Sequence, residues 1–388
     1  MRCTLLLFLL IVFGSESVLA QNDNFRAYRD SVRQAQEAFN LQYSSANGSN
    51  QAQAFQTQFS AEFEAFKTEM VQKWGDFKQR TNTEWVEYFD EGNARVEVDF
   101  MLDRVSLEVL VDRSQNTEQR VASLPRMLIE TIQSQGSEFG FEAAQGDYSP
   151  VLNRPVLSNQ LTKRVSESNT DYALRIIENN QPSVRQINGA DGTERAVLTL
   201  TFDLLPDALR ERAKRVQSFV FKYSDRYNLY PSLVFAIIHT ESFFNPMAQS
   251  ADNAIGLMQL TSAGNGAEAY QAVYGGNDLP SDEFLFDPEN NIQLGCAYIN
   301  LLLNTHLNDI NNDLTKQYLA IAAYNTGSSN VFRAYDRNGS KPRAIRKIES
   351  MTPQENYEFL IQNLPSEETR TYLKKVVERS QLYDSWGE

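Results

Sequence analysis

The stretch that decides the fold is YPSLVFAIIHTESFFNPMAQSADNAIGLMQ, residues 230–259. Pro231 and the helix-compatible run behind it predict a helix that reaches Glu241. At 3.6 residues per turn, Val234, Ile237 and Glu241 share one face of this helix. The pattern therefore places a carboxyl group at the end of an apolar stripe.

A carboxyl group in apolar surroundings is costly to ionise, so its pKa rises and it can carry a proton near neutral pH. A general acid that protonates a glycosidic oxygen needs this property. Glu241 could instead be a solvated residue at a helix end, or the partner of a lysine or arginine. Its position alone leaves both interpretations open.

Further short motifs follow in a fixed order. They are ES with NP at 241–246, AIGLMQ at 254–259, FLFDP at 284–288, AYNTG at 323–327 and ETRTY at 368–372. Each motif is weak alone, but the ordered set resembles the lytic murein transglycosylases related to goose-type lysozymes, and within them the transglycosylase C branch. The resemblance continues more loosely into the amino-terminal part, through WVEY at 85–88.

The resemblance implies an all-α, lysozyme-like catalytic domain that cleaves the β-1,4 bond between MurNAc and GlcNAc in peptidoglycan. It implies Glu241 as the catalytic acid/base. It also implies five substrate-binding residues: Ser250 at the N-acetyl group, Gln259 in the cleft wall, Tyr324 and Asn325 beside the carboxylate, and Tyr372 near it. Alternatively, the residues Gly256, Leu257 and Met258 could only shape a turn and fill the core, and Tyr324 could only cap a helix.

The possible cleavage reactions differ in how many catalytic carboxylates they need. Ordinary glycosidases set two carboxylates across the bond. The resemblance implies a single glutamate that also deprotonates the muramic acid's own 6-hydroxyl, so that 1,6-anhydro-MurNAc ends form by intramolecular attack. A hydrolytic lysozyme of the same fold, with Asp252 as second carboxylate, is one alternative. A catalytically silent peptidoglycan-binding protein is another.

Composition excludes several other classes of protein. The 388 residues carry a net charge of −14, which argues against a general nucleic-acid binder. The sequence has two cysteines, Cys3 and Cys296, and two histidines, His239 and His306, too few for a Cys/His zinc cluster. We expect no metal, no cofactor, peptidoglycan glycan strands as the partner, and a monomer.

Hydrophobic periodicity divides the rest of the chain. Phe55, Phe59, Phe63 and Phe66 share one helical face, whereas residues 95–100, 105–111 and 195–204 alternate as strands. The prediction is α+β overall, with a helical segment at 21–88, a small α+β accessory domain at 89–205 and the all-α domain at 206–388.

The first twenty residues have the pattern of a secretory signal. Arg2, an apolar run at 5–13 and small residues before Ala20 predict cleavage near Ala20. Transglycosylase C proteins carry a lipid on a cysteine directly after the signal, but here Gln21 follows. We therefore expect a periplasmic or secreted protein, associated with the cell envelope but without an outer-membrane lipid anchor.

Overall fold

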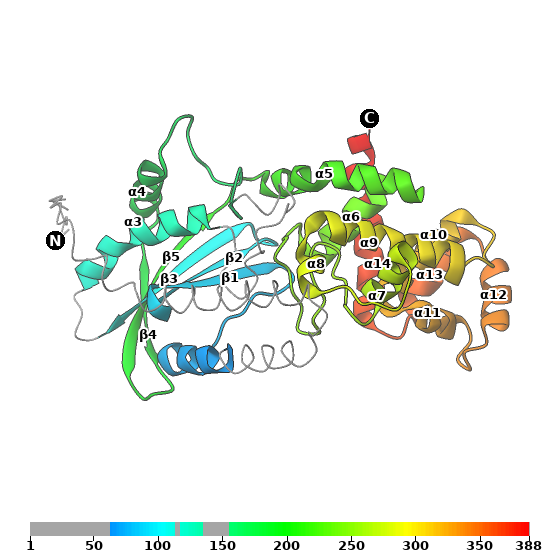
Figure 1. The fold of residues 1–388 in the computed structure, drawn as a ribbon, viewed down its shortest axis with the longest axis horizontal. Helices are drawn as coiled ribbons and strands as arrows, with labels where there is room; N and C mark the ends of the chain where they lie inside the picture. The colour runs from blue at the N-terminus through cyan, green and yellow to red at the C-terminus, as the bar shows by residue number, and fades with distance from the viewer. Residues whose placement is uncertain (1–62, 113–116, 135–154, 388) are drawn as a thin grey trace.

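The computed structural model describes residues 63–112, 117–134 and 155–387, and Figure 1 shows a sheet-containing part beside a helical part. The described residues form an antiparallel five-stranded sheet of order β1-β2-β3-β5-β4. Its strands are β1 Glu84–Phe89, β2 Ala94–Asp99, β3 Arg104–Asp112, β4 Ser183–Asn188 and β5 Glu194–Asp203, with the 3-10 turn Asp90–Gly92 between the first two.

Helices cover both faces of the sheet. Helices α3, Thr117–Gln133, and α4, Asn169–Asn179, bury their apolar sides against one face. The helical segment at 63–74 packs Phe66 and Trp74 against the other face. This segment and the helices α3 and α4 lie on opposite sides of the sheet in Figure 1.

The prediction of helix up to residue 88 is wrong for its last residues, which form β1. Because the sheet is covered on both sides, the two faces of this strand are both largely apolar: Trp85 faces one core, and Val86 and Tyr88 face the other. The polar alternation that reveals a half-exposed strand is therefore missing. Phe66 is buried, whereas Phe55, Phe59 and the proposed signal at 1–20 lie outside the described residues.

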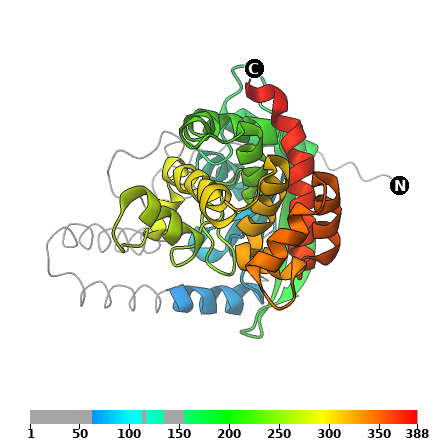
Figure 2. The same ribbon diagram turned by 90° about the vertical axis from the view of Figure 1, so that its right-hand side faces the viewer.

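The carboxy-terminal part is all-α in its described residues, so the predicted fold class is confirmed. Helix α6, Pro231–Ser242, runs through the core, with every residue from 233 to 239 buried. Around it lie α5 Ala208–Tyr227, α7 Asn265–Tyr274, α8 Asp282–Phe286, α9 Pro288–Leu301, α10 Asp313–Thr326, α11 Ser328–Tyr335, α12 Lys341–Glu349, α13 Pro353–Asn363, α14 Glu367–Ser380, the π-turn Leu302–His306 and the 3-10 segment Gln381–Gly387. Seen from the helical end, α5 and the segment at 63–74 lie on opposite sides of the molecule (Figure 2).

A buried arginine joins the two parts. Arg212 on α5 is 1% exposed and donates to the carbonyl oxygen of Phe100 at 2.9 Å, the Asp103 carboxylate at 2.8 Å and the Gln160 side chain at 2.9 Å. Its Nε donates to the carbonyl oxygen of Phe243 at 2.9 Å. A buried charge is tolerated when its donors are satisfied, so this network fixes α5 and the end of α6 against the sheet part.

Candidate active site

The end of α6 holds Glu241 in place. The helix stops because Phe243 and Phe244 adopt left-handed φ angles of 50° and 60°. The Ser242 hydroxyl is hydrogen-bonded to the carbonyl oxygen of Ile238 at 3.1 Å and to that of Leu257 at 2.8 Å. The serine that follows Glu241 therefore ties the helix end to the turn of the GLMQ motif.

That turn is fixed by a buried asparagine on α9. The Asn291 side chain accepts from the backbone N–H of Met258 at 2.8 Å and donates to the carbonyl oxygens of Ile255 and Leu285 at 2.9 and 2.7 Å. Gly256 has a φ of +75°, and a Cβ there would lie 2.7 Å from the Leu285 oxygen. Only glycine fits this position without displacing the neighbouring backbone.

Gln259 ends the same turn and is buried. Its side-chain nitrogen donates to the carbonyl oxygen of Gly256 at 2.9 Å. The Tyr324 hydroxyl donates to the carbonyl oxygen of Met258 at 2.8 Å. Both side chains thus stabilise the turn, and the predicted contact of Gln259 with a glycan stays a prediction.

The Glu241 carboxyl lies near two tyrosines and a second acid. Burial raises the pKa of Glu241 to about 8, with the neighbouring Tyr372 hydroxyl lowering it and the Glu368 charge raising it. Burial also raises the pKa of Tyr324 and Tyr372, and the charge of Glu241 adds to the rise in both. The structure therefore brings together three of the predicted residues, Glu241, Tyr324 and Tyr372.

No ion pair joins Glu241 to a lysine or arginine in the part of the chain that the structure describes, so the paired interpretation does not apply there. The Tyr372 hydroxyl is buried and has no hydrogen-bond partner among the described residues. A buried hydroxyl normally has a hydrogen-bond partner, and the Glu241 carboxyl is the neighbour to which this hydroxyl can donate.

Asn325 contacts the residues at the beginning of α14, the helix that carries Tyr372. Its side chain donates to Glu368 at 3.4 Å and accepts from the Thr369 hydroxyl at 2.7 Å. These bonds hold the end of α10 against the beginning of α14, the helix that carries Tyr372. Asn325 contacts Glu368, whose charge acts on Glu241, and its predicted place beside the Glu241 carboxylate stays a prediction.

Ser250 lies on the loop after α6, and its hydroxyl accepts from the backbone N–H of Ala254 at 3.1 Å. The same loop lines a cavity against the sheet part, and no contact joins Ser250 to Glu241 among the interactions of the described residues. Asp252 is exposed in this turn. The carboxylate that acts on Glu241 is Glu368.

One residue that contacts Glu241, Asn82, lies outside the sequence motifs. The side-chain amide of Asn82, from the segment before β1, donates to the carbonyl oxygen of Glu241 at 3.1 Å. Next to it, the backbone N–H of Gln249 donates to the carbonyl oxygen of Thr81 at 3.3 Å. Because Asn82 and Glu241 are 159 residues apart, no local pattern could have paired them.

Two other reactive residues, His239 and Cys296, are buried in the core. His239 is buried, which lowers its pKa to about 3, and its Nδ1 is 3.0 Å from the Tyr383 hydroxyl. Cys296 is a buried free thiol whose pKa burial raises. Within the described ranges, no group of three or more His, Cys, Asp or Glu side chains could hold a metal ion.

Comparison with known proteins identifies the family. Residues 218–346 match the family model described as the transglycosylase SLT domain. The chain is 31% identical over 308 residues to membrane-bound lytic murein transglycosylase C of Pectobacterium atrosepticum. The matched region covers 76% of this chain and 80% of that protein. The chain belongs to the membrane-bound lytic murein transglycosylase C family.

Another member, membrane-bound lytic murein transglycosylase C of Haemophilus influenzae, is 32% identical over 302 residues, which is 76% of this chain and 79% of that protein. Among solved structures, the 70 kDa soluble lytic transglycosylase of Escherichia coli aligns with 46% of this chain and 26% of its own, at 24% identity and a TM-score of 0.35.

The relatives correct the predicted localisation. Members of the transglycosylase C family are named membrane-bound, so the expectation of an unanchored periplasmic or secreted protein is wrong. That expectation rested on Gln21 in place of a lipid-bearing cysteine, and one missing attachment point does not exclude attachment by other means. None of the described helices has the length and apolar character needed to cross a membrane.

Proposed function

We propose that this protein is a peptidoglycan lytic transglycosylase that cleaves the β-1,4 bond between MurNAc and GlcNAc with Glu241 as its single acid/base. The observation that carries the proposal is the environment of Glu241, where burial raises the carboxyl's pKa to about 8. Such a carboxyl is protonated at neutral pH and is ready to act as a general acid.

In the first step, Glu241 gives its proton to the glycosidic oxygen, the C1–O4 bond breaks, and GlcNAc leaves as an alcohol. Positive charge develops at C1 of MurNAc while Glu241 becomes a carboxylate. The Tyr372 hydroxyl, buried and without a partner among the described residues, can donate a hydrogen bond to that new charge. Hydrogen bonds to charged groups are about twice as strong as neutral ones.

In the second step, the Glu241 carboxylate takes the proton from the 6-hydroxyl of the same MurNAc. The oxygen at C6 then attacks C1 and closes the 1,6-anhydro ring. This restores the protonated carboxyl, so protons balance over the cycle. Capture within one sugar needs no bound water and has a high effective concentration.

Asp252, the second carboxylate of the hydrolytic alternative, is not among the groups that shift the pKa of Glu241. A retaining glycosidase sets its two carboxyl groups about 5–5.5 Å apart, and an inverting one about 6.5–9.5 Å. Asp252 is exposed in a turn. Glu368 acts on Glu241 through its charge but is bonded to Asn325 at 3.4 Å.

We further propose that the glycan contacts Ser250, Gln259, Tyr324, Asn325 and Tyr372, and that the chain works as a monomer with its domain boundary near residue 206. Residues 1–20 would direct export to the cell envelope, where peptidoglycan lies. A sugar site needs fixed polar groups among apolar walls, and side chains of these types can supply them.

Mass analysis of the products from purified peptidoglycan tests the proposed reaction. We expect 1,6-anhydro-MurNAc ends, one water lighter than hydrolysed ends. Reducing ends as the main product would contradict the proposal and favour the lysozyme alternative, and no cleavage by the folded protein would favour a binding protein.

A further inference from the structure

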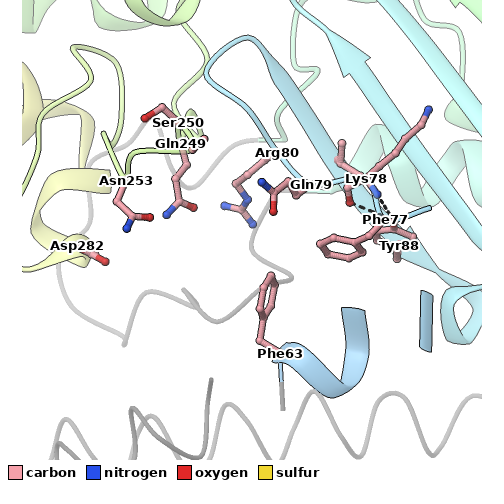
Figure 3. Close-up of a pocket in the computed structure, with 12 residues that line it drawn as sticks. Phe63, Phe77, Lys78, Gln79, Arg80, Tyr88, Gln249, Ser250, Asn253 and Asp282 are labelled. Atoms are coloured by element: carbon pink, nitrogen blue, oxygen red, sulfur yellow. Dashed lines mark hydrogen bonds between the residues drawn. The ribbon is translucent and has the colours of Figure 1, made fainter. Parts of the chain in front are cut away.

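A cavity of about 370 Å³ lies where the sheet part meets the loop that follows α6. Figure 3 shows the side chain of Arg80 between Gln249 and Asn253 of the loop on one side and Gln79 on the other. The cavity is lined by Phe63, Phe77, Lys78, Gln79, Arg80, Val86, Tyr88, Gln249, Ser250, Ala251, Asn253 and Asp282.

Arg80 is the unusual member of this lining. Its Nη1 atom is buried and has no hydrogen-bond partner in the described part of the chain. Burial lowers the pKa of Arg80 to about 10 against the opposing effect of Glu87, so the guanidinium stays charged at neutral pH. A buried donor left without a partner costs about 1–3 kcal/mol, and more when it is charged.

The other lysine or arginine of the lining is already paired. Lys78 lies 2.5 Å from Glu97 and 3.4 Å from Glu108. In Figure 3 its amine points away from the loop, whereas Arg80 points into the space between the loop and Phe63. The cavity thus combines a guanidinium whose Nη1 atom has no hydrogen-bond partner among the described residues with amide groups from Gln79, Gln249 and Asn253.

The remaining wall is aromatic. Phe77 and Tyr88 are stacked with ring centroids 5.9 Å apart, and Phe63 meets Phe77 edge-on at 5.9 Å. An apolar wall, several amides and one cation suit a short peptide that ends in a carboxylate.

The cavity adjoins the candidate active site through the backbone. Arg80 is two residues before Asn82, which bonds the carbonyl oxygen of Glu241 at 3.1 Å. Gln249, on the opposite wall, bonds the carbonyl oxygen of Thr81 through its N–H at 3.3 Å. Ser250, which we propose as a glycan contact, also lines the cavity. We therefore expect a glycan strand at Glu241 to bring a group attached to its MurNAc to this cavity.

We propose that the cavity binds a free carboxylate of the peptide carried by MurNAc, with Arg80 as its counter-ion. This inference rests on the proposed function and adds to it a preference for peptide-bearing strands. Arg80 would be a specificity-determining residue that takes no part in the chemical step.

The test compares kcat/KM for soluble glycan strands that carry peptides with kcat/KM for strands from which the peptides have been removed. In the full chain, Arg80→Met should lower the ratio of the two values about ten- to hundred-fold, the size expected for a charge-assisted hydrogen bond. The matched control is Arg337→Met, because Arg337 is exposed and is not among the residues that line the cavity. This control should keep the wild-type ratio.

A third substrate shows whether the charge of the peptide carboxylate or the shape of the peptide is recognised. Strands whose peptide carboxylates have been converted to amides should be cleaved by the wild type no better than peptide-free strands. If amidated and free peptides are cleaved equally well, or if Arg80→Met changes both substrates equally, the carboxylate site is wrong.

The outcomes also separate this inference from the proposed function. A wild-type enzyme that forms 1,6-anhydro ends but shows no preference for peptides overturns only the inference. A wild-type enzyme that forms no 1,6-anhydro ends overturns the proposed function. Thermal unfolding of Arg80→Met checks that the variant is folded, because buried Glu87 loses the opposite charge of Arg80.

Discussion

The side-chain amide of Asn82 donates a 3.1 Å hydrogen bond to the carbonyl oxygen of Glu241, across 159 residues of sequence. The residue that we propose as the acid/base is thus held from two sides, by its own helix and by the sheet part. Together with the Arg212 network, this bond makes the sheet part a support for the active site.

Asn82→Ala should lower kcat about ten-fold and change KM little. The variant removes a positioning contact and leaves the proposed glycan contacts intact, and small displacements of a catalytic group are costly. Steady-state kinetics on peptide-free strands measure the split. A rise in KM at constant kcat would instead place Asn82 in substrate binding.

Arg212→Met should destabilise the folded protein by about 3–5 kcal/mol, because it leaves the partners of a buried, fully bonded cation unsatisfied. Arg212 is 1% exposed and has four hydrogen bonds, to Phe100, Asp103, Gln160 and Phe243. Denaturant unfolding measures the loss, with exposed Arg337→Met as control. Equal stability of the two variants would show that the network contributes little.

Glu241→Gln should lower activity by about 10²–10⁴-fold while the protein stays folded, because the amide cannot shuttle a proton. The substitution should also change how the stability of the folded protein depends on pH. The pKa of Glu241 is about 8 in the folded protein and 4.5 ordinarily, so the wild type loses stability as pH rises between these values.

The glutamine variant lacks that loss, so its melting temperature should exceed the wild-type value by more at pH 8 than at pH 5. Thermal unfolding at both pH values provides the comparison. A difference between the two proteins that does not change with pH would mean that Glu241 titrates as an ordinary surface acid.

Two neighbours of Glu241 should shift its pKa in opposite directions. The Glu368 charge raises this pKa, so Glu368→Gln should lower it, and the Tyr372 hydroxyl lowers it, so Tyr372→Phe should raise it. Each shift moves the alkaline fall of kcat/KM in the same direction, by on the order of half a pH unit to one unit. Shifts in the same direction for both variants would contradict the assignment.

Part of the fold was predictable from periodicity. The strands β2, β3 and β5 were predicted because each keeps a clear apolar pattern. Strand β1 was missed because both its faces are covered. Strand β4 was missed because it is a polar edge strand, almost entirely exposed.

Some residues of the candidate site were likewise predicted from the sequence, and others were not. Glu241, Tyr324 and Tyr372 were predicted through motifs that keep their order in sequence, and their side chains meet in the structure. Asn82 and Arg80 were not predicted, because their importance comes from the packing of the sheet part against the loop after α6. Such contacts leave no periodic or local signal.

The pH dependence of kcat/KM for the wild type tests the central claim most directly, because it reports the protonation of the free enzyme's essential acid. The measurement uses a soluble, peptide-free glycan strand from about pH 3 to about pH 10, with product mass analysis at each point. The account predicts a constant value at neutral pH and a fall governed by one group with a pKa of about 8. A fall governed by a group with a pKa near 4.5 would contradict it, because Glu241 would then be ionised at neutral pH and could not be the acid.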